Sequence, residues 1–445
     1  MKISNLVGII ADDLTGANDT ALQFKKCDAK TKILLDYTIP AENDSNTEIW
    51  AVSTESRNVD AKEAGRRMIE TIANLNKNLN LEYFYKKIDS TLRGNIAVET
   101  LVMVETLGYD AAVIMPAFPA EGRITVGGYH LSRGVPISKT EMAGDPHSPI
   151  TESYIPALLQ SQLSDDNKDM VGLIGLKTVL NGAGPIFMKL KELIKQGKKL
   201  IVADASSMTD IEQIVLAINK SSNKILLAGT AATGSILAKE WVPETPDIAN
   251  ADGICGAVVP KSPRLIISGS ATKINSEQIE QLEKSYDYDN ICSIPLSAEN
   301  IINGIDDNLV EKIISNLDAN NTVVVHSSKL MDSFDGFSDD SLKEEWTRAK
   351  FSSKITDFLA ELTKTILDKR QVILITLGGE TSYKCCKAIS SDELIMKDEV
   401  APAIALCVDG KNRWIITKSG NLGKPKTLID ILNYLDEHED SEGLS

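Results

Sequence analysis

The sequence is poor in the residues that build disulfide frameworks and zinc sites. Its six cysteines are scattered along 445 residues without a C-x-x-C pair, and it has only four histidines. This pattern excludes a disulfide-rich secreted protein and a zinc-binding domain, because both need closely spaced thiols or imidazoles. We therefore expect a protein of the reducing cytoplasm.

Long apolar runs and an excess of positive charge are also absent. No apolar run approaches the roughly 18 residues of a transmembrane helix, and we expect neither a signal peptide nor a membrane partner. Asp and Glu outnumber Lys and Arg by 63 to 47, which gives a net charge of −16. This balance argues against nucleic acid as a partner, since nucleic acid is bound through many Lys and Arg contacts with phosphates.

The chain is too long for one compact core, and its length predicts two domains of roughly 200 residues each. Short apolar strands alternate with amphipathic helices, which is typical of an α/β fold with mostly parallel sheets covered on both faces. Four prolines fall within 21 residues, from Pro243 to Pro263, and indicate a connection. We therefore predict an N-terminal domain over residues 1–245, a linker over 246–263 and a C-terminal domain over 264–445.

The individual elements follow from the same alternation. The expected strands cover residues 6–11, 32–35, 49–53, 83–88, 111–115, 171–173, 199–203, 224–228, 264–267, 322–326, 371–376 and 414–417. The expected helices cover residues 61–73, 98–106, 185–196, 275–283, 356–367 and 381–388.

Two carboxylates follow the first expected strand. Residues 6–11 have the pattern of a short buried strand, residues 20–24 that of a helix, and Asp12 and Asp13 lie between them. The carboxyl ends of strands are where open α/β sheets bind ligands, so this turn is a candidate site. The alternative is that one aspartate only caps the helix.

A second polar turn follows the expected strand at residues 83–88. Lys, Asp, Ser, Thr and Arg side chains crowd into the seven residues from Lys87 to Arg93. Lys87 and Arg93 can bind an anion while Asp89 accepts the proton of a hydroxyl, and a polyhydroxy carboxylate needs both. The alternative is a solvated loop with internal salt bridges.

Three glycine-containing turns follow strands in the C-terminal half. One expected strand leads into Gly378-Gly379-Glu380-Thr381-Ser382. Glycines let the backbone come close to a phosphate, and the free N–H groups at the start of the following helix can donate hydrogen bonds to it. It is not a Walker A loop, since the Gly-Lys-Ser/Thr signature is missing. Ser268-Gly269-Ser270 and Lys418-Ser419-Gly420-Asn421 also follow strands, so the three turns can converge on a nucleotide. The alternative for each is a tight connection.

In their order and spacing, these stretches resemble the four-carbon acid sugar kinases, a family that phosphorylates threonate, erythronate and related tetronates with ATP. The resemblance runs along nearly the whole chain. It also includes Ser53-Thr54-Glu55-Ser56-Arg57, Pro116-Ala117-Phe118-Pro119-Ala120-Glu121-Gly122-Arg123, Asp145-Pro146-His147-Ser148-Pro149-Ile150-Thr151-Glu152-Ser153 and the run from Lys418 to Gly423.

The resemblance implies site residues in each half. In the N-terminal half it implies substrate binding by Asp13, Arg57, Lys87, Asp89 and Ser90. Arg57 is suited to clamp the substrate carboxylate in a bidentate fork. In the C-terminal half the residues implied to contact ATP are Ser268, Gly378, Gly379, Glu380, Thr381 and Gly420.

The implied reaction is transfer of the γ-phosphoryl group of ATP to a hydroxyl of a four-carbon sugar acid, with the terminal C4 hydroxyl as the expected acceptor. Such a transfer needs an acceptor for the hydroxyl proton and cations on the phosphates. Asp13 and Asp89 are both candidates for the catalytic base. Mg²⁺ is expected on the nucleotide, with no protein ligand assigned. We expect His130 and His147 to be structural rather than catalytic.

Two other functions stay open as alternatives. A non-catalytic sensor of acid sugars or nucleotides would keep the fold, although polar clusters in both halves favour an enzyme. An NAD-dependent oxidoreductase of sugar acids also uses glycine turns after strands, but no G-x-G-x-x-G follows the first strand. Neither the stereoisomer of the substrate nor the oligomeric state follows from the sequence, and a homo-oligomer is one alternative.

Overall fold

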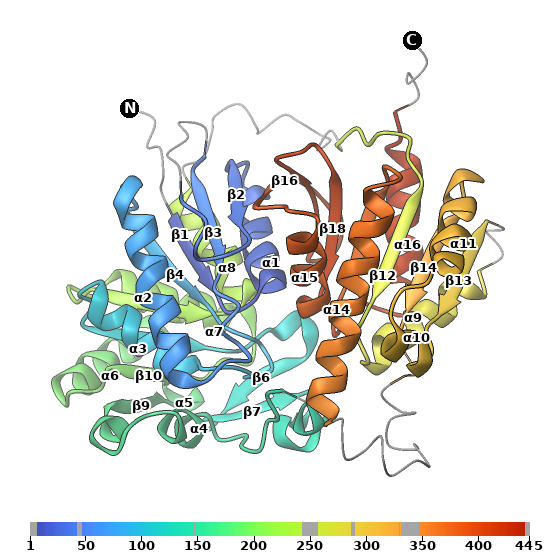
Figure 1. Cartoon of the computed structure of the whole chain (residues 1–445). Helices are drawn as coiled ribbons and strands as arrows, with labels where there is room; N and C mark the ends of the chain where they lie inside the picture. Colours follow the sequence, from blue (N-terminus) through green and yellow to red (C-terminus); the bar gives the residue numbers. More distant parts are fainter. Residues whose placement is uncertain are drawn as a thin grey trace. The chain divides into compact units, whose positions relative to one another are not determined.

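The computed structural model describes residues 7–41, 47–145, 147–242, 257–285, 290–328, 330 and 347–440. Met1–Glu244 and Thr245–Ser445 form two compact units, and each contains a sheet with helices packed on it (Figure 1). This confirms the predicted class of two α/β domains with mostly parallel sheets. Residues 246–256 of the predicted linker lie outside the described residues, so the linker bounds stay a prediction.

The main sheet of the first unit has eight parallel strands in the order β2-β3-β1-β4-β11-β5-β10-β9. Most of them are short apolar runs, such as Val-Gly-Ile-Ile-Ala in β1, and every residue of β1 is buried. Such runs are typical of parallel strands covered by helices on both faces. The strands are β1 (Val7–Ala11), β2 (Thr31–Leu34), β3 (Ile49–Ser53), β4 (Tyr83–Lys87), β5 (Ala111–Met115), β9 (Val171–Ile174), β10 (Leu200–Ala203) and β11 (Ile225–Gly229).

The helices of the first unit connect these strands and pack in pairs, α1 with α8, α2 with α3 and α6 with α7. In α2 the buried residues recur every three or four positions, from Ala64 to Leu75, and Asp60 caps the helix start by accepting a hydrogen bond from Glu63 N. The helices are α1 (Leu14–Lys25), α2 (Ala61–Asn78), α3 (Ile96–Thr106), α4 (Ile155–Ser161), α5 (Leu176–Val179), α6 (Ala183–Lys195), α7 (Met208–Asn219) and α8 (Ala231–Trp241).

A small antiparallel sheet, β6-β7-β8, also belongs to the first unit. Thr125 N donates to Ala205 O at 2.9 Å, and Asp204 accepts from the backbone N–H groups of Gly127 and Gly128 at 2.6 and 2.9 Å. These bonds attach the β6–β7 hairpin to the loop after β10. The strands are β6 (Arg123–Val126), β7 (Tyr129–Ser132) and β8 (Val135–Pro136).

The strand order creates a ligand-binding position in the first unit. After β1 the chain crosses to β2 on one side of the sheet, whereas after β4 it crosses toward β5 on the other side. Open α/β sheets bind ligands at the carboxyl ends of two such neighbouring strands, where the connections diverge. Asp12 and Asp13 follow β1 and the segment from Ile88 to Arg93 follows β4. Both predicted polar turns therefore lie at this switch point.

The sheet of the second unit has the order β13-β14-β12-β15-β18-β17-β16. Its first five strands are parallel, and β17 and β16 continue antiparallel. The connections leaving β12 and β15 diverge, so the switch point of this unit lies between those two strands. The strands are β12 (Arg264–Ser268), β13 (Ile291–Pro295), β14 (Thr322–His326), β15 (Ile373–Leu377), β16 (Glu393–Ala401), β17 (Ile404–Asp409) and β18 (Trp414–Lys418). The helices are α9 (Lys273–Glu283), α10 (Ala298–Asn303), α11 (Asp307–Asp318), α14 (Arg348–Leu367), α15 (Gly379–Ala388) and α16 (Thr427–Glu437).

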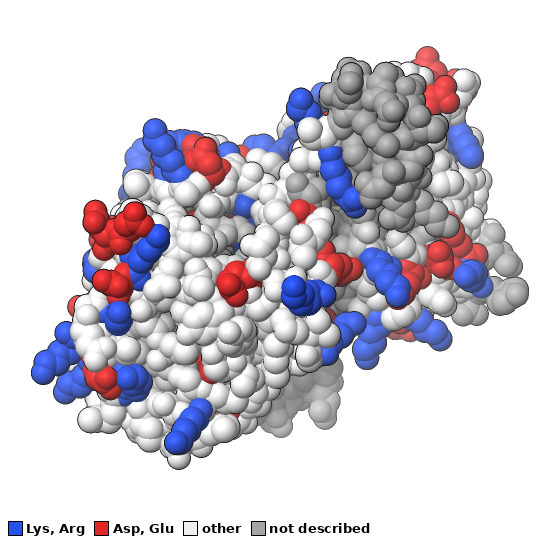
Figure 2. Space-filling view, turned by 90° about the horizontal axis from the view of Figure 1, so that it is seen from below, with Lys and Arg blue, Asp and Glu red and all other residues white. Residues whose placement is uncertain are grey.

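Charged side chains of both signs are mixed on the face shown in Figure 2. On that face the described residues form no continuous basic stripe of the kind that nucleic-acid-binding proteins present. Among the described helices, none combines the length and the apolar character needed to cross a membrane.

A buried ion pair supports the loops of the first unit. Lys86 in β4 and Glu99 in α3 are almost fully buried, and Lys86 Nζ lies 2.7 Å from Glu99 Oε2. Glu99 Oε1 also accepts a hydrogen bond of 2.6 Å from Ser56 Oγ, and Lys86 Nζ donates to Lys87 O at 3.0 Å. The pair therefore joins β4, α3 and the loop after β3.

We expect Lys86→Met to destabilise the fold by about 3–5 kcal/mol, because it leaves the carboxylate of Glu99 buried and without its partner. Urea unfolding followed by circular dichroism measures the change in the free energy of unfolding. The control Lys77→Met alters an exposed position of α2 and should cost less than about 0.5 kcal/mol. A cost of Lys86→Met as small as that of the control would contradict the supporting role of the pair.

Candidate functional site

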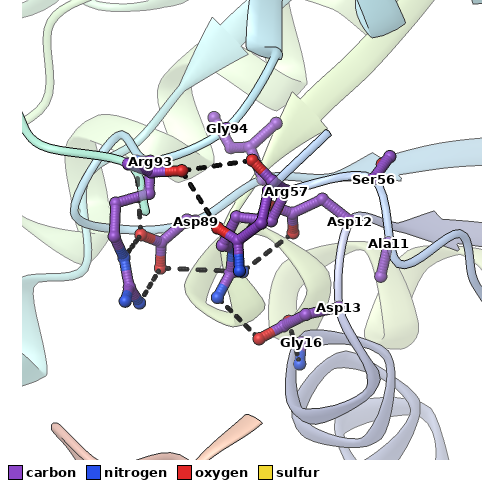
Figure 3. Close-up of polar contacts among 12 residues, drawn as sticks. Ala11, Asp12, Asp13, Gly16, Ser56, Arg57, Asp89, Arg93 and Gly94 are labelled. Carbon is purple, nitrogen blue, oxygen red and sulfur yellow. Dashed lines mark hydrogen bonds and ion pairs between the residues drawn. The ribbon is translucent and has the colours of Figure 1, made fainter. Parts of the chain in front are cut away.

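Three loops of the first unit meet at the carboxyl ends of β1, β3 and β4. Asp12 and Asp13 follow β1, Arg57 lies in the loop after β3, and Asp89 lies in the loop after β4 (Figure 3). A backbone hydrogen bond of 3.1 Å from Ser56 N to Asp12 O joins the first two loops. The fold thus gathers into one place the charged side chains that the sequence carries on separate turns.

Arg57 is the centre of this cluster. Its Nε and Nη2 atoms lie 2.8 and 2.9 Å from the two carboxylate oxygens of Asp12, which is a bidentate pair. Its Nη1 atom lies 2.6 Å from Asp13 Oδ2, and Nη2 also lies 3.9 Å from Asp89 Oδ1. The fork that was expected to clamp a substrate carboxylate is therefore occupied by Asp12.

These contacts keep Asp12 and Arg57 ionised. Burial would raise the pKa of Asp12, but the charge and hydrogen bonds of Arg57, with two lysines of β4, hold that pKa below its usual value. Burial likewise opposes the charge of Arg57, yet Asp12, Asp13 and Asp89 raise its pKa well above the usual value. Buried charges persist in proteins when they are paired in this way.

Asp13 both caps a helix and belongs to the cluster around Arg57. Its Oδ1 accepts a hydrogen bond from Gly16 N and its Oδ2 one from Thr15 Oγ1, each at 2.8 Å, so it is the N-cap of α1. Asp13 therefore caps the helix, but it does more than the alternative of a cap alone, because it also contacts Arg57. A Cβ added at Gly16 would lie 2.7 Å from Asp13 Oδ1 and 2.9 Å from Lys87 Nζ. The carboxylate of Asp13 and the ammonium group of Lys87 thus both lie close to the position that a side chain at Gly16 would occupy.

Asp89 is held by its own loop. Its Oδ2 accepts hydrogen bonds from Thr91 Oγ1 and from Arg93 Nε, the latter at 2.8 Å, and Arg93 Nη1 lies 3.2 Å from Asp145 Oδ2. Burial would raise the pKa of Asp89, but the charges of Arg93 and Arg57 and these hydrogen bonds hold it well below its usual value. Asp89 is therefore an ionised acceptor at neutral pH, although Arg93 already forms the internal salt bridge of the alternative interpretation.

Ser90 is fixed from the small antiparallel sheet. Its Oγ accepts a hydrogen bond of 2.7 Å from Arg123 Nη1, and its carbonyl oxygen lies 2.8 Å from His130 Nε2. Burial lowers the pKa of His130 to about 4, so the ring is neutral at neutral pH. A neutral ring that donates from Nε2 accepts at Nδ1, where Thr125 Oγ1 lies at 3.2 Å. His130 thus holds the backbone of Ser90, and its role as a structural rather than catalytic residue stays a prediction.

Glu55 is a site residue that the sequence did not single out. Its backbone is left-handed, with φ of +46°, which is uncommon for a residue other than glycine. Its Oε1 accepts hydrogen bonds from Leu14 N at 3.0 Å and from Ser53 Oγ at 2.5 Å. Burial, together with the charge of Asp13, raises the pKa of Glu55 to about 8, against these hydrogen bonds. A neutral carboxyl group therefore lies beside the ionised cluster at neutral pH.

In the second unit the structure brings the three predicted turns together. They follow β12, β15 and β18, which are neighbours in the sheet. Gly378 N donates to Lys418 O at 2.8 Å, and Thr272 Oγ1 donates to Gly420 O at 2.7 Å. The residues gathered here include all those expected to contact a nucleotide: Ser268, Gly378, Gly379, Glu380, Thr381 and Gly420.

Close packing and backbone geometry require glycine in these turns. A Cβ added at Gly420 would collide with Ser270 Oγ. Gly378 has a φ of +111°, which L side chains rarely adopt, and it precedes α15. Because Gly378 brings no side chain to the start of α15, the first N–H groups of that helix can face an anion.

Glu380 has its side chain directed toward α14. Its Oε1 lies 2.9 Å from Lys384 Nζ and accepts a hydrogen bond of 3.0 Å from Thr356 Oγ1. Lys384 Nζ also lies 2.7 Å from Asp357 Oδ1. The carboxylate therefore fastens the first turn of α15 to α14.

Lys418 is fully buried at the end of β18. Its Nζ donates to Ser419 O at 2.9 Å and to Leu422 O at 3.1 Å, and burial lowers its pKa to about 7. The ammonium group thus shapes the turn that contains Gly420.

Comparisons with known proteins cover both units. Residues 7–237 match the model of a sugar-binding N-terminal domain, and residues 265–428 match that of a nucleotide-binding C-terminal domain. The D-erythronate kinase of Heliobacterium modesticaldum is 30% identical over 97% of each chain. This chain belongs to the four-carbon acid sugar kinase family. The D-threonate kinase of Salmonella typhimurium, another member, is 27% identical over 96% of this chain and 98% of its own.

A solved structure shares the fold of this chain. The crystal structure of Haemophilus influenzae protein HI1011 superposes with a TM-score of 0.69 at 23% identity, over 96% of this chain and 100% of that chain. The family match confirms the resemblance drawn from the sequence motifs. The first unit is the sugar-binding domain and the second the nucleotide-binding domain, while the roles of individual residues stay predictions.

Glu55→Gln is expected to change how stability depends on pH. The folded protein binds a proton at Glu55 up to a pKa of about 8, against an ordinary value of 4.5. Because the folded state binds this proton more tightly than the unfolded state, protonation of Glu55 stabilises the fold. This stabilisation is fully present below the pKa of the unfolded state, 4.5, and is lost as the pH rises through about 8. Glutamine keeps an oxygen for Leu14 N and Ser53 Oγ but cannot titrate. As the pH is raised from 5 to 8, the free energy of unfolding of Glu55→Gln should therefore rise by about 1–2 kcal/mol relative to that of wild type.

Urea unfolding at both pH values measures this gain. Glu212→Gln, at an exposed position of α7, is the control and should follow wild type at each pH. A difference between Glu55→Gln and wild type that is the same at pH 5 and pH 8 would show that Glu55 is ionised throughout.

Proposed function

We propose that this protein is an ATP-dependent kinase that transfers the γ-phosphoryl group of ATP to a hydroxyl of a four-carbon sugar acid. Threonate, erythronate and 3-oxo-tetronate are the proposed acceptors, with transfer to the terminal C4 hydroxyl. The observation that carries the proposal is the ionised cluster around Arg57 at the switch point of the sugar-binding domain. The names of the relatives, D-erythronate kinase and D-threonate kinase, support the same class of substrate.

The proposed substrate site suits a chain with several hydroxyls. Ionised carboxylates accept hydrogen bonds from hydroxyl groups, and nearby cations offset the charge of those carboxylates. Because the fork of Arg57 is filled by Asp12, we assign Arg57 the task of holding the aspartates in place beside the substrate. The residues of this site are Asp13, Arg57, Lys87, Asp89 and Ser90.

An aspartate is the proposed acceptor for the proton of the attacking hydroxyl. As the hydroxyl oxygen bonds to the γ-phosphorus, the bond from that phosphorus to the bridging oxygen of ATP breaks, ADP leaves, and the proton passes to the carboxylate. Asp89 is ionised at neutral pH because its pKa is low, and Asp13 lies across the same cluster. We retain both as candidates, and their variants below separate them.

In the nucleotide-binding domain, we propose that ATP binds at the turns after β12, β15 and β18. The N-terminus of α15 suits a phosphate because its N–H groups and its dipole favour negative charge. The side chain of Glu380 is paired with Lys384, so its proposed contact is through the backbone. Mg²⁺ on the nucleotide would neutralise part of the charge of the phosphates, and we assign it no protein ligand. The proposed residues are Ser268, Gly378, Gly379, Glu380, Thr381 and Gly420.

An ADP-release assay with Mg-ATP and a panel of tetronates tests the proposed reaction. Wild type should release ADP with at least one acid, and Asp89→Asn or Asp13→Asn should lower kcat by about 100-fold or more where the aspartate takes up the proton. The variant with the larger loss of kcat identifies the base. Asp165→Asn, on the surface of the same domain, should keep the wild-type rate. Absence of ADP release with every tetronate would reject the kinase proposal in favour of a sensor.

Gly378→Ala tests the phosphate position in the nucleotide-binding domain. The change strains a backbone with φ of +111° at the start of α15, so the KM for ATP should rise about 10-fold while the KM for the tetronate stays within about 2-fold. Gly304→Ala is the matched control, since Gly304 has φ of +87° and nothing within 4 Å of an added Cβ. Unchanged KM for ATP in Gly378→Ala would place the phosphates elsewhere.

A further inference from the structure

Arg123 is a cation beside the proposed substrate site that has no carboxylate partner among the described residues. It begins β6, and its Nη1 donates to Ser90 Oγ at 2.7 Å. Its Nε–H is buried and has no hydrogen-bond partner among the residues that the structure describes. No described carboxylate oxygen lies within 4.0 Å of its guanidinium group, in contrast to the two other arginines of the site.

Those two arginines are already committed to aspartates. Arg57 directs Nε and Nη2 at Asp12 and Nη1 at Asp13. Arg93 directs Nε at Asp89 and Nη1 toward Asp145. Neither guanidinium group therefore has a full edge left for a carboxylate of the substrate.

Arg123 differs at the same edge. The Nε and Nη2 atoms form the side of a guanidinium group that receives a carboxylate in a bidentate pair, and Arg57 uses that side for Asp12. In Arg123 the described residues offer an acceptor to Nη1 alone. Burial also lowers the pKa of Arg123, against the charges of Asp89 and Glu121, so its charge is incompletely compensated in the free protein.

We propose that Arg123 binds the carboxylate of the four-carbon sugar acid. The proposal rests on the proposed function and replaces the expected carboxylate clamp, Arg57, with a different residue. The substrate supplies the missing acceptor for Nε and Nη2, and Ser90 keeps its hydrogen bond to Nη1. With the acid end at Arg123, the hydroxyl groups of the chain face the aspartates, which accept but do not donate.

A purely structural role for Arg123 would be to orient Ser90. The carbonyl oxygen of Ser90 is already held by His130 Nε2 at 2.8 Å, so the backbone of this residue has an anchor independent of Arg123. The two roles predict different selectivity. Charge recognition affects an acid far more than its uncharged amide, whereas a displaced Ser90 affects both alike.

Kinetics with a tetronate and the corresponding tetronamide separate these roles. In Arg123→Gln we expect kcat/KM for the acid to fall about 100-fold, mainly through KM, and that for the amide to fall less than about 3-fold. Arg123→Lys, which keeps the charge without the fork, should restore part of the preference for the acid. Ser90→Ala should affect acid and amide equally. Arg133→Gln, an exposed arginine near Arg123, should leave both substrates at wild-type values.

An equal loss for acid and amide in Arg123→Gln would overturn the proposal. Failure of the kinase function is recognised separately, as absence of ADP release by wild type with every tetronate. In that case calorimetric titration of the same tetronates into the full chain decides the matter. Binding by wild type that is lost in Arg123→Gln and kept in Arg133→Gln supports the carboxylate site. Equal binding by wild type and Arg123→Gln, or no binding by wild type, overturns it.

Discussion

The contact between Arg57 and its aspartates is the interaction on which the sugar-binding domain depends. It joins the loops after β1 and β3, keeps Asp12 ionised, and places Asp13 at both the helix start and the site. A carboxylate buried without such a partner would take up a proton and lose its value as an acceptor. As a consequence, the hydrogen-bond donors of the Arg57 guanidinium group are already used by Asp12 and Asp13. Recognition of an acidic substrate then needs a second cation, and Arg123 is available for it.

Each domain solves the same problem, which is to bring turns from distant parts of the chain to the switch point of a parallel sheet. Buried lysines contribute in both. Lys86 is paired with Glu99 and donates to the carbonyl oxygen of Lys87, whereas Lys418 donates to carbonyl oxygens of its own turn. In each case the Nζ of a buried lysine donates to the backbone at the end of a strand and fixes it. The side chains and N–H groups that we propose to face the ligand are thereby set in position before the ligand binds.

Sequence patterns predict the central strands well and the pairings of side chains poorly. Residues 49–53 and 111–115 were expected as strands and form β3 and β5, because fully buried parallel strands are short apolar runs. The antiparallel strands β16 and β17 were missed: β16 is partly exposed and mixes charged and apolar residues, whereas β17 is a buried, largely apolar run that was not recognised as a strand. The β6–β7 hairpin was missed as well, although two adjacent glycines between short strands are a turn signal. Which carboxylate meets Arg57, and which cation stays unpaired, depends on contacts between loops that no local pattern encodes.

The chemistry of the acceptors bears on which tetronate fits. Ionised aspartates accept hydrogen bonds but cannot donate them, so a hydroxyl can face them and a ketone cannot. A buried acceptor left opposite a carbonyl oxygen costs about 1–3 kcal/mol, or roughly 10- to 100-fold in discrimination. Lys87, whose Nζ lies with Asp13 Oδ1 beside the position of an added Cβ at Gly16, is a donor that can face either a hydroxyl or a ketone. In the proposed site, a C3 opposite Lys87 would admit 3-oxo-tetronate, whereas a C3 opposite an aspartate would favour the hydroxylated acids.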